Sequence, residues 1–210
     1  MVDKIDFDSA RHIYSIDGKQ YPSVTTVLQE TGINDMSNIN PEILQKASNF
    51  GLAVHKLLEL SIKGTLDITS VDEPLKPYMA HWNDFVMNHK VEVINSELML
   101  VDKSLQFAGT IDVVAKVNGA LSLIDFKTST MILPHYYLQT AGYKILAIAN
   151  GMDIVNRYIL KLEPDKYKVE WCKAEVYDRS MFTSVLNIWH YKKKNQKYFE
   201  GKGGYVYANI

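Results

Sequence analysis

A two-residue turn, Asn118-Gly119, between two apolar runs is the feature that most constrains the fold of this chain. Asn-Gly between alternating apolar residues is the strongest short-range signal for a β-hairpin. Such a turn fixes which residues face each other, because the two strands pair outward from it residue by residue. By this register Asp112 lies opposite Asp125. The sequence therefore predicts two carboxylates that face each other across the hairpin.

Two carboxylates in such a position need a cation or a shared proton between them. Cross-strand neighbours have Cβ atoms roughly 4.5–5.5 Å apart, and like charges at that distance repel. Oxygen ligands in a small open cluster favour Mg²⁺ or Mn²⁺, with water and phosphate oxygens in the remaining positions. Lys127 follows Asp125 on the same face of the strand, where its ammonium can orient a metal-bound water. Taken alone, the Asp125–Lys127 pair also fits a strand end whose acid is neutralised by the lysine.

Three hydroxyl residues, Thr128, Ser129 and Thr130, follow directly after Lys127. They are suited to phosphate contacts just beyond the strand end, although an ordinary polar loop explains each one equally well. His55 lies in the middle of a helical pattern. A lone histidine in a helix is more often a core or surface residue than a metal ligand.

A later helical stretch carries Gln139 and Tyr143 four residues apart on one face, with Tyr136 in the same stripe. One interpretation is a helix with aromatic core residues and a polar edge. The other has Gln139 bonding into the site and a tyrosine stacking on a nucleic-acid base. The residues alone do not decide between the two.

Hydrophobic periodicity predicts an alternating order of helices and strands. A mixed α/β fold follows, with a mixed central sheet and helices on both sides. No repeat or linker interrupts the pattern, so residues 1–210 are predicted to form one domain. Glu97, in the first strand, is a further acidic candidate that a loop at 102–105 would place opposite Thr110. The helices are expected at 24–29, 41–63, 75–88, 135–150 and 178–199, and the main strands at 91–101, 106–128 (the hairpin), 153–162 and 167–176.

Composition excludes several classes of protein. A single cysteine, Cys172, excludes a disulfide framework and a four-cysteine iron–sulfur cluster. A formal net charge of −1 gives no overall attraction to nucleic acid, so DNA binding would depend on local charge or a metal. No apolar run approaches the roughly 18 residues of a membrane span, and the N-terminal stretch lacks a targeting pattern. A cytoplasmic protein without membrane contact is expected.

Several of these features form an ordered set of motifs. The set resembles the RecB-like branch of the PD-(D/E)XK nucleases, which includes the Cas4 proteins. The similarity is closest to the mitochondrial genome maintenance exonuclease type and its small phage and bacterial relatives, and it runs from about residue 11 to 145. In chain order the motifs are RHIYSIDGKQYPSVTT near the start, His55, the GTID stretch ending at Asp112, the DFK stretch of Asp125 to Lys127, and the QTAGY stretch of Gln139 to Tyr143.

The resemblance implies a restriction-endonuclease-like α/β core that cleaves DNA phosphodiesters with Mg²⁺ or Mn²⁺. His55 matches the metal-ligating histidine of the family, and Asp112 and Asp125 match its two acidic ligands. Phe126 is expected to offer its backbone carbonyl to the metal. Lys127 matches the catalytic lysine.

The resemblance also assigns a supporting and DNA-contacting motif to Gln139 and Tyr143. With Tyr136, Thr128 and Ser129 they make up the predicted substrate side of the site. The iron–sulfur cysteines of many Cas4-type relatives are absent, so no cluster is expected. A Walker A loop is absent too, which predicts an enzyme that acts on strands or ends it receives.

The leading hypothesis is a metal-dependent exonuclease for single-stranded DNA or DNA ends, of phage or bacterial origin, in replication, recombination or repair. One alternative is a double-strand-specific recombination exonuclease that works with a single-strand-annealing or recombinase protein. Another, from a different class, is a catalytically silent DNA-binding protein that keeps the nuclease fold. Polarity of digestion and oligomeric state are left open.

Overall fold

The structure is a computed structural model that describes residues 4–8 and 13–199 of the chain. The first two residues of the RHIYSIDGKQYPSVTT motif therefore lie outside the described residues. Two sheets are present in the described part: a small one of order β1-β2-β3 and a five-stranded one of order β4-β5-β6-β7-β8. The strands are β1 (Asp6–Asp8), β2 (Ile13–Ile16), β3 (Lys19–Tyr21), β4 (Glu92–Asp102), β5 (Phe107–Val117), β6 (Ala120–Lys127), β7 (Asn156–Leu162) and β8 (Tyr167–Trp171).

The helices alternate with these strands as the periodicity predicts. Ser23 begins the first helix by accepting a hydrogen bond from the Thr26 amide, and Asn40 begins the second in the same way through the Glu42 amide. Short 3₁₀ turns at Ile68–Ser70 and Glu73–Leu75 lead into the third. The helices are α1 (Val24–Glu30), α2 (Pro41–Ile62), α3 (Lys76–Asn88), α4 (Pro134–Ala149), α5 (Glu175–Lys194) and α6 (Gln196–Phe199).

The hairpin at Asn118-Gly119 has the predicted register. Both turn residues have positive φ, +49° and +85°, as a tight hairpin turn of this kind requires. The regular ladder between β5 and β6 ends at Val113 and Ile124, one pair before the two aspartates. Beyond that point β6 continues beside β7 in parallel, while the other neighbours in the large sheet are antiparallel. The sheet is therefore mixed, as the sequence predicts.

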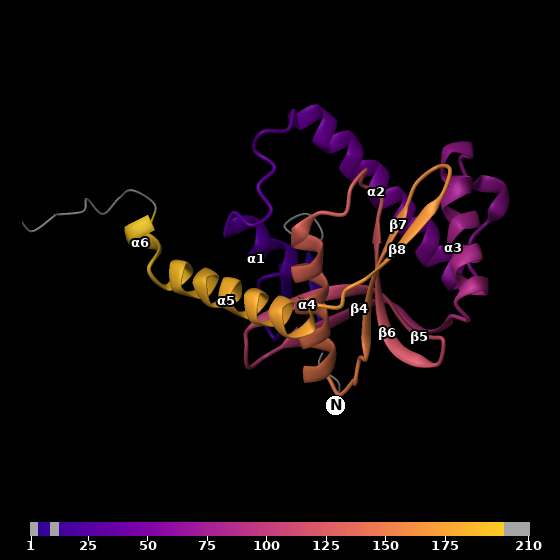
Figure 1. Ribbon diagram of the computed structural model, residues 1–210. Coiled ribbons are helices and arrows are strands. Elements are labelled where there is room, and N and C mark those ends of the chain that lie inside the picture. The colour runs from indigo at the N-terminus through magenta and orange to yellow at the C-terminus, as the bar shows by residue number, and fades with distance from the viewer. Residues whose placement is uncertain (1–3, 9–12, 200–210) are drawn as a thin grey trace, which may run out of the picture.

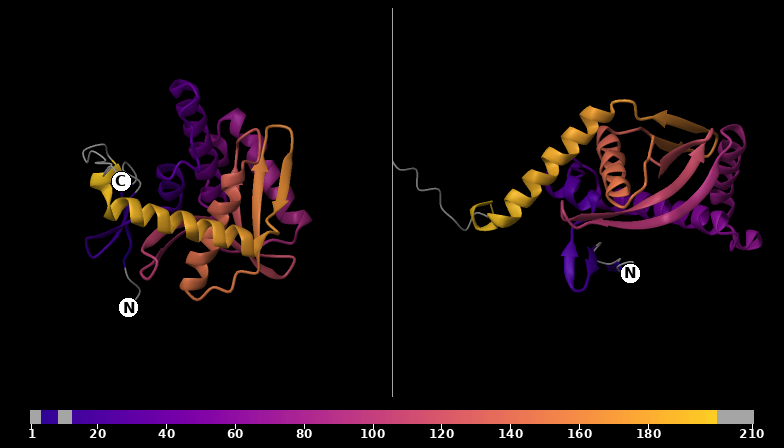
Figure 2. Two further views of the ribbon diagram at one scale, coloured as in Figure 1. Left: turned by 60° about the vertical axis from the view of Figure 1, so that its left-hand side comes forward. Right: turned by 90° about the horizontal axis from the view of Figure 1, so that it is seen from below.

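Helices cover both faces of the large sheet (Figures 1 and 2). One apolar core lies under α1, α4 and α5, and a second lies under α2 and α3. Leu123 of β6 belongs to the first core and Ile124 to the second, because side chains alternate along a strand. The predicted α/β class with helices on both sides is confirmed.

Several predicted boundaries in the C-terminal part of the chain are wrong. The strand expected at 153–162 begins at Asn156. The strand expected at 167–176 ends at Trp171, and α5 begins at Glu175 in place of residue 178. The apolar alternation changes phase between Trp171 and Cys172, and Glu175 and Asp178 pair with the buried Arg157 at the start of α5. The expected single helix to residue 199 is also interrupted, because Asn195 ends α5 and α6 follows separately.

Candidate metal centre

Three elements bring the predicted site residues together where β5 and β6 stop pairing. Asp112 lies on β5, Asp125 and Lys127 lie on β6, and His55 reaches the same place from the middle of α2. His55 Nδ1 is 3.5 Å from Asp112 Oδ1. Lys127 Nζ is 2.6 Å from Asp125 Oδ2. The site therefore contains two contacts of opposite charge, one on each side of the gap between the strands.

The side chain of Asp112 replaces backbone pairing at this gap. Its Oδ2 accepts a hydrogen bond of 2.7 Å from the Phe126 amide, which would otherwise lack a cross-strand partner on β5. The same bond orients Asp112 so that Oδ1 is left for His55. Asp112 Oδ2 thus connects β5 to β6 beyond the ladder, and Asp112 Oδ1 faces His55 in the candidate site.

The electrostatics of the site reflect three competing influences. Burial raises the pKa of Asp125 to about 6; Lys127 opposes this increase and Asp112 adds to it. Burial would also raise the pKa of Asp112, but His55 and Lys127 outweigh it and lower that pKa. Burial opposes protonation of His55 and Lys127, yet the neighbouring carboxylates raise the pKa of both. Lys127 is therefore held as an ammonium.

Glu97 stands opposite Asp112, not opposite Thr110 as the sequence predicts. The turn between β4 and β5 covers residues 103–106, one residue later than the loop expected at 102–105, so the register is shifted by two. Leu98 pairs with Ile111, and Glu97 itself has a φ of +51°, an unusual backbone for a residue with a side chain. Burial, with the negative charge of Asp112, raises the pKa of Glu97 to about 7.

The donor set fits a divalent cation. Nitrogen or oxygen atoms of His55, Glu97 and Asp112 all lie within 4.8 Å of one another. Asp125 is 1% exposed, and neither of its oxygens receives a well-directed hydrogen bond within the described residues, although Lys127 is ion-paired with it. A buried carboxylate without hydrogen-bond donors is where an ion would be expected. Carboxylate oxygens and one imidazole suit Mg²⁺ or Mn²⁺.

Gln139 and Tyr143 lie behind the site and bond to each other. Gln139 Nε2 donates a hydrogen bond of 2.9 Å to the Tyr143 hydroxyl, and both side chains are buried, at 8% and 6% exposure. The Tyr143 ring presses on β5 at Gly109, where an added Cβ would meet its Cε1 at 2.9 Å. Burial and the two aspartates raise the pKa of Tyr143 well above its ordinary value. The ring faces the core of the protein.

Tyr136 and the hydroxyl residues line the exit of β6. The Tyr136 hydroxyl donates to Ser129 Oγ at 3.0 Å, and Ser129 donates to the carbonyl of Met131 at 2.8 Å. Lys127 Nζ lies 4.8 Å from the centre of the Tyr136 ring, within the range of a cation–π contact. Thr128 Oγ1 lies beside α2 at Gly51, where an added Cβ would be 3.3 Å away.

Two residues near Lys127 were not singled out from the sequence. Lys161 is the cross-strand partner of Lys127 on β7, and its ammonium donates to the Thr130 carbonyl at 2.5 Å and pairs with Glu163 at 3.1 Å. His135, at the start of α4, has its pKa lowered by burial and by the charge of Lys127. A prediction of the parallel register between β6 and β7 would have placed Lys161 beside Lys127.

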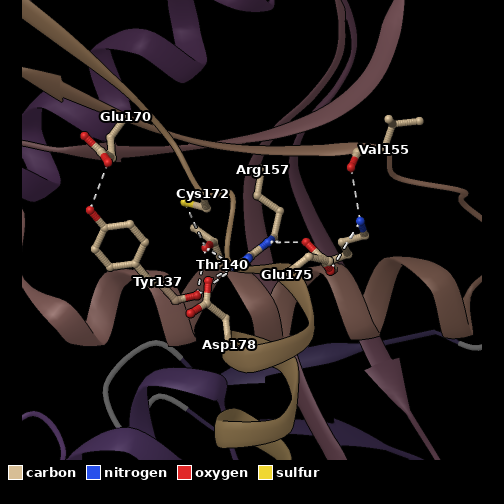
Figure 3. A network of polar contacts seen from close by, with 9 residues as sticks. Tyr137, Thr140, Val155, Arg157, Glu170, Cys172, Glu175 and Asp178 are labelled. Carbon is tan, nitrogen blue, oxygen red and sulfur yellow. Dashed lines mark hydrogen bonds and ion pairs between the residues drawn. The ribbon is translucent and has the colours of Figure 1, made fainter.

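A buried arginine fixes the helix that carries Gln139 and Tyr143. Arg157 is 0% exposed; its guanidinium bonds to Asp178 at 2.7 Å and Glu175 at 2.9 Å, both on α5. The same group donates to Thr140 Oγ1 and to the Tyr137 carbonyl of α4 (Figure 3). One side chain of β7 thus connects the sheet to two helices.

Comparisons with known proteins place this fold. No protein-family model matches the sequence, and no curated protein matches it. An alkaline exonuclease from Laribacter hongkongensis is similar with a TM-score of 0.51 and 10% identity, over 87% of this chain and 92% of that one. The chain shares its fold with an exonuclease. At this identity the likeness extends to the fold alone.

Two further solved structures resemble the chain less closely. The same exonuclease in complex with dAMP aligns with a TM-score of 0.42 and 12% identity, over 87% of this chain and 94% of that one. A candidate exonuclease from Eubacterium rectale aligns with a TM-score of 0.45 and 11% identity, over 68% of each chain. Among the described helices, none combines the length and apolar character needed to cross a membrane.

Proposed function

We propose that this protein is a metal-dependent DNA exonuclease of the RecB-like PD-(D/E)XK type, formed as one domain over residues 1–210. The observation that carries the proposal is the convergence of His55, Asp112, Asp125 and Lys127 at the point where β5 and β6 separate. A fold shared with an exonuclease supports it. We propose that it works on single-stranded DNA or DNA ends in a bacterial or phage-infected cytoplasm.

In this proposal the cation ligands are His55, Asp112, Asp125 and the Phe126 carbonyl. The chemistry that Mg²⁺ or Mn²⁺ supplies in such a site is activation of a water and stabilisation of the charge that develops on phosphorus oxygens. The protein contributes the ligand geometry, since the Phe126 amide holds Asp112 in place at 2.7 Å. Burial of the site also keeps bulk water away from the carboxylates.

We assign Lys127 the role of contacting the attacking water or the scissile phosphate. Its ammonium is held by Asp125 at 2.6 Å and by the face of the Tyr136 ring, so it points to one place. A fixed positive charge there can orient the nucleophile and offset the charge of the phosphate. Thr128 and Ser129 are assigned to neighbouring phosphates at the β6 exit.

We assign Gln139 and Tyr143 the role of holding α4 in place behind the site. Their mutual hydrogen bond and their burial position α4 against β5, where the Tyr143 ring contacts Gly109. Tyr136 is only 9% exposed, but it lies beside Lys127 and Ser129 at the β6 exit, whereas the Tyr143 ring is packed on Gly109; base stacking is therefore assigned to Tyr136. The aromatic face beside Lys127 suits a base next to a phosphate.

Lys127→Ala tests the mechanism. We expect the rate of digestion of end-labelled single-stranded DNA with Mn²⁺ or Mg²⁺ to fall by at least about 10²-fold, the usual contribution of a positioned proton-transfer group. Lys116→Ala is the matched control, since Lys116 is an exposed lysine on the same hairpin. An unchanged rate in Lys127→Ala would contradict the proposal.

Substrate form is tested separately with linear and circular DNA, single-stranded and duplex, labelled at either end. An exonuclease for single strands digests the linear single strand and leaves both circles intact. Faster digestion of blunt duplex would favour the double-strand-specific recombination exonuclease. Binding of DNA without cleavage in either metal would favour the silent DNA-binding protein.

A further inference from the structure

We propose that the C-terminal end of α5, together with α6, binds single-stranded DNA at a place separate from the candidate metal centre. The inference rests on the proposed function, because DNA is the polymer that the nuclease would hold. The surface concerned, which we call the basic surface, consists of side chains from the last turn of α5 and from α6: Tyr191, Lys192, Lys194, Lys197, Tyr198 and Phe199.

The basic surface is a fixed part of the fold. In Figures 1 and 2, α6 lies at the end of α5 that points away from the large sheet, whereas the candidate metal ligands lie on α2, β5 and β6. Two contacts to α1 hold this end of α5. The Trp189 indole donates a hydrogen bond of 2.9 Å to Glu30 Oε2, and Lys193 pairs with the same oxygen at 2.9 Å.

The local charge favours a polyanion. The whole chain has a formal net charge of −1, yet residues 188–199 contain four lysines and no acid. Of these lysines, only Lys193 forms an ion pair with a described residue. Three ammonium groups within six residues are therefore left for phosphates. A patch of this kind is what DNA binding requires in a chain without an overall positive charge.

Exposed aromatic rings lie among the lysines. Tyr191, Tyr198 and Phe199 are 62%, 51% and 49% exposed. Lys197 Nζ lies 4.8 Å from the centre of the Tyr198 ring, and the centres of the Tyr191 and Phe199 rings lie 6.2 Å apart. Rings beside ammonium groups match the bases and phosphates of a single strand, whose base faces are free to stack. The surface therefore favours single-stranded DNA over a duplex.

Helix stability explains only part of this arrangement. Lysines in the last turn of a helix interact favourably with its dipole, and Lys192 and Lys194 lie in that turn of α5. Lys197 lies beyond the end of α5, because Asn195 ends the helix by donating its amide to the carbonyls of Tyr191 and Lys192. The dipole of α5 accounts neither for Lys197 nor for the exposed rings.

A second contact on one strand would hold the substrate between cuts. While the end of the strand lies in the metal centre, a more distant part bound at the basic surface makes each rebinding an intramolecular step. We therefore expect the protein to remove many nucleotides from a long strand in each binding event.

Anisotropy of fluorescein-labelled oligothymidylate, added to the full chain in EDTA, tests the proposal without digestion. The variant carries Lys192→Gln, Lys194→Gln and Lys197→Gln together. We expect its affinity at about 0.1 M salt to fall by at least about 10-fold. The slope of log affinity against log salt should become shallower by about 2, because each phosphate contact to a single strand contributes roughly 0.7.

The matched control carries Lys19→Gln, Lys116→Gln and Lys166→Gln, three exposed lysines on other elements or turns. It changes the net charge by the same amount and is expected to keep the affinity and the salt slope. Equal losses in the two triple variants would assign binding to net charge and overturn the basic surface. Arginine at positions 192, 194 and 197 should preserve binding, and circular dichroism checks the fold of each variant.

Tyr198→Ala tests the rings separately from the charge. Loss of a stacked base is expected to weaken binding about 5-fold or more with an unchanged salt slope. An unchanged affinity would contradict the assignment to single strands. Vesicles that contain phosphatidylserine are the competing ligand. Binding to these vesicles without binding to oligothymidylate would overturn the DNA assignment in favour of a lipid surface.

The outcomes separate this inference from the proposed function. Digestion of DNA that depends on Lys127, in a protein whose binding of oligothymidylate is indifferent to the three lysines, would overturn the basic surface and leave the nuclease intact. Binding that depends on the three lysines, in a protein that digests no DNA with Mg²⁺ or Mn²⁺, would support the basic surface and contradict the nuclease.

Discussion

Asp125 is a buried carboxylate between a positive neighbour, Lys127, and a negative one, Asp112. A buried carboxylate is stable as an ion only while a positive partner is present, because removing that partner leaves the carboxylate charge uncompensated. Burial, together with the negative charge of Asp112, raises the pKa of both Asp125 and Glu97. The site without a cation is therefore a source of instability, which the proposed cation would relieve on binding.

A pH dependence follows at the residue scale. A carboxyl group whose pKa is higher in the folded chain binds more protons when folded, so stability falls as pH rises between the two values. The window is 4.5 to about 7 for Glu97 and 3.8 to about 6 for Asp125. We expect the melting temperature in EDTA to fall from pH 5 to pH 7.5, and Mn²⁺ to reverse the fall.

Glu97→Gln is the control for this measurement. Without the ionisable carboxyl group, the decrease of melting temperature above pH 5 should become shallower, while the contribution of Asp125 persists at lower pH. If the variant and the unaltered protein show the same slope between pH 5 and 7.5, the raised pKa of Glu97 is wrong.

Tyr136 gives a second residue-scale prediction. Its ring lies under Lys127, and its hydroxyl holds Ser129, so two substitutions separate the roles. Tyr136→Phe keeps the ring and should retain most activity. Tyr136→Leu removes a cation–π contact worth about 0.5–2 kcal/mol, and we expect kcat to fall about 2- to 30-fold. Equal losses in both variants would assign the effect to the hydroxyl. Single-turnover digestion of labelled DNA measures it.

The residue scale also shows what the sequence could predict. The Asn118-Gly119 turn determines the register of the hairpin, and the β5–β6 ladder confirms it as far as Val113 and Ile124. The position of Glu97 depends on the length of another turn, which lacks a comparable two-residue signal, and there the prediction was wrong. His55 is a distant ligand candidate that only the resemblance identified, because tertiary folding, not spacing, brings α2 to the strands.

At the scale of elements, close contact between β5 and α4 is the tightest constraint behind the site. Gly109→Ala places a Cβ 2.9 Å from the Tyr143 ring and 3.1 Å from Leu146. We expect a loss of about 1–3 kcal/mol in the free energy of unfolding from overpacking, measured by urea denaturation. Activity should also fall, because α4 carries Gln139 and Tyr143 and must shift away.

Gly142→Ala is the matched variant on the same helix. Its added Cβ would lie 2.8 Å from the Phe182 ring of α5, a residue that is not among the proposed site residues. A similar loss of stability is expected, with activity per folded molecule kept. If both variants lose activity alike, the effect of Gly109→Ala is not specific to the Tyr143 contact.

Element boundaries were predictable where local signals exist. Proline at the first turn marks the starts of α2 and α4, and the structure agrees with both. The end of β8 has a weaker signal: the alternation changes phase between Trp171 and Cys172, and α5 begins where Glu175 and Asp178 pair with Arg157 of another strand. A partner far away in sequence decides that boundary.

At the scale of the whole molecule, Arg157 connects β7 to both α4 and α5 (Figure 3). Replacing it with methionine leaves Asp178 buried without a counter-charge. Breaking a buried pair in this way typically costs about 3–5 kcal/mol. We expect Arg157→Met to lower the free energy of unfolding by about that amount in urea denaturation.

Lys168→Met provides the contrast. Lys168 is paired with Glu170 at 3.3 Å on the surface, and exposed pairs contribute about 0–1 kcal/mol. A loss no larger for Arg157→Met than for Lys168→Met would mean that the buried network does not hold the helices.

The same network has a consequence for the order in which the protein is made. Every proposed ligand, and the helix with Gln139 and Tyr143, leaves the ribosome before α5 does. Until Glu175 and Asp178 have been synthesised, the buried Arg157 lacks its carboxylate partners. We therefore expect α4 to pack stably on the sheet only once α5 is present. A nascent chain would therefore carry all its proposed ligand residues before the site is assembled, so the proposed nuclease activity is expected only after α5 has been made.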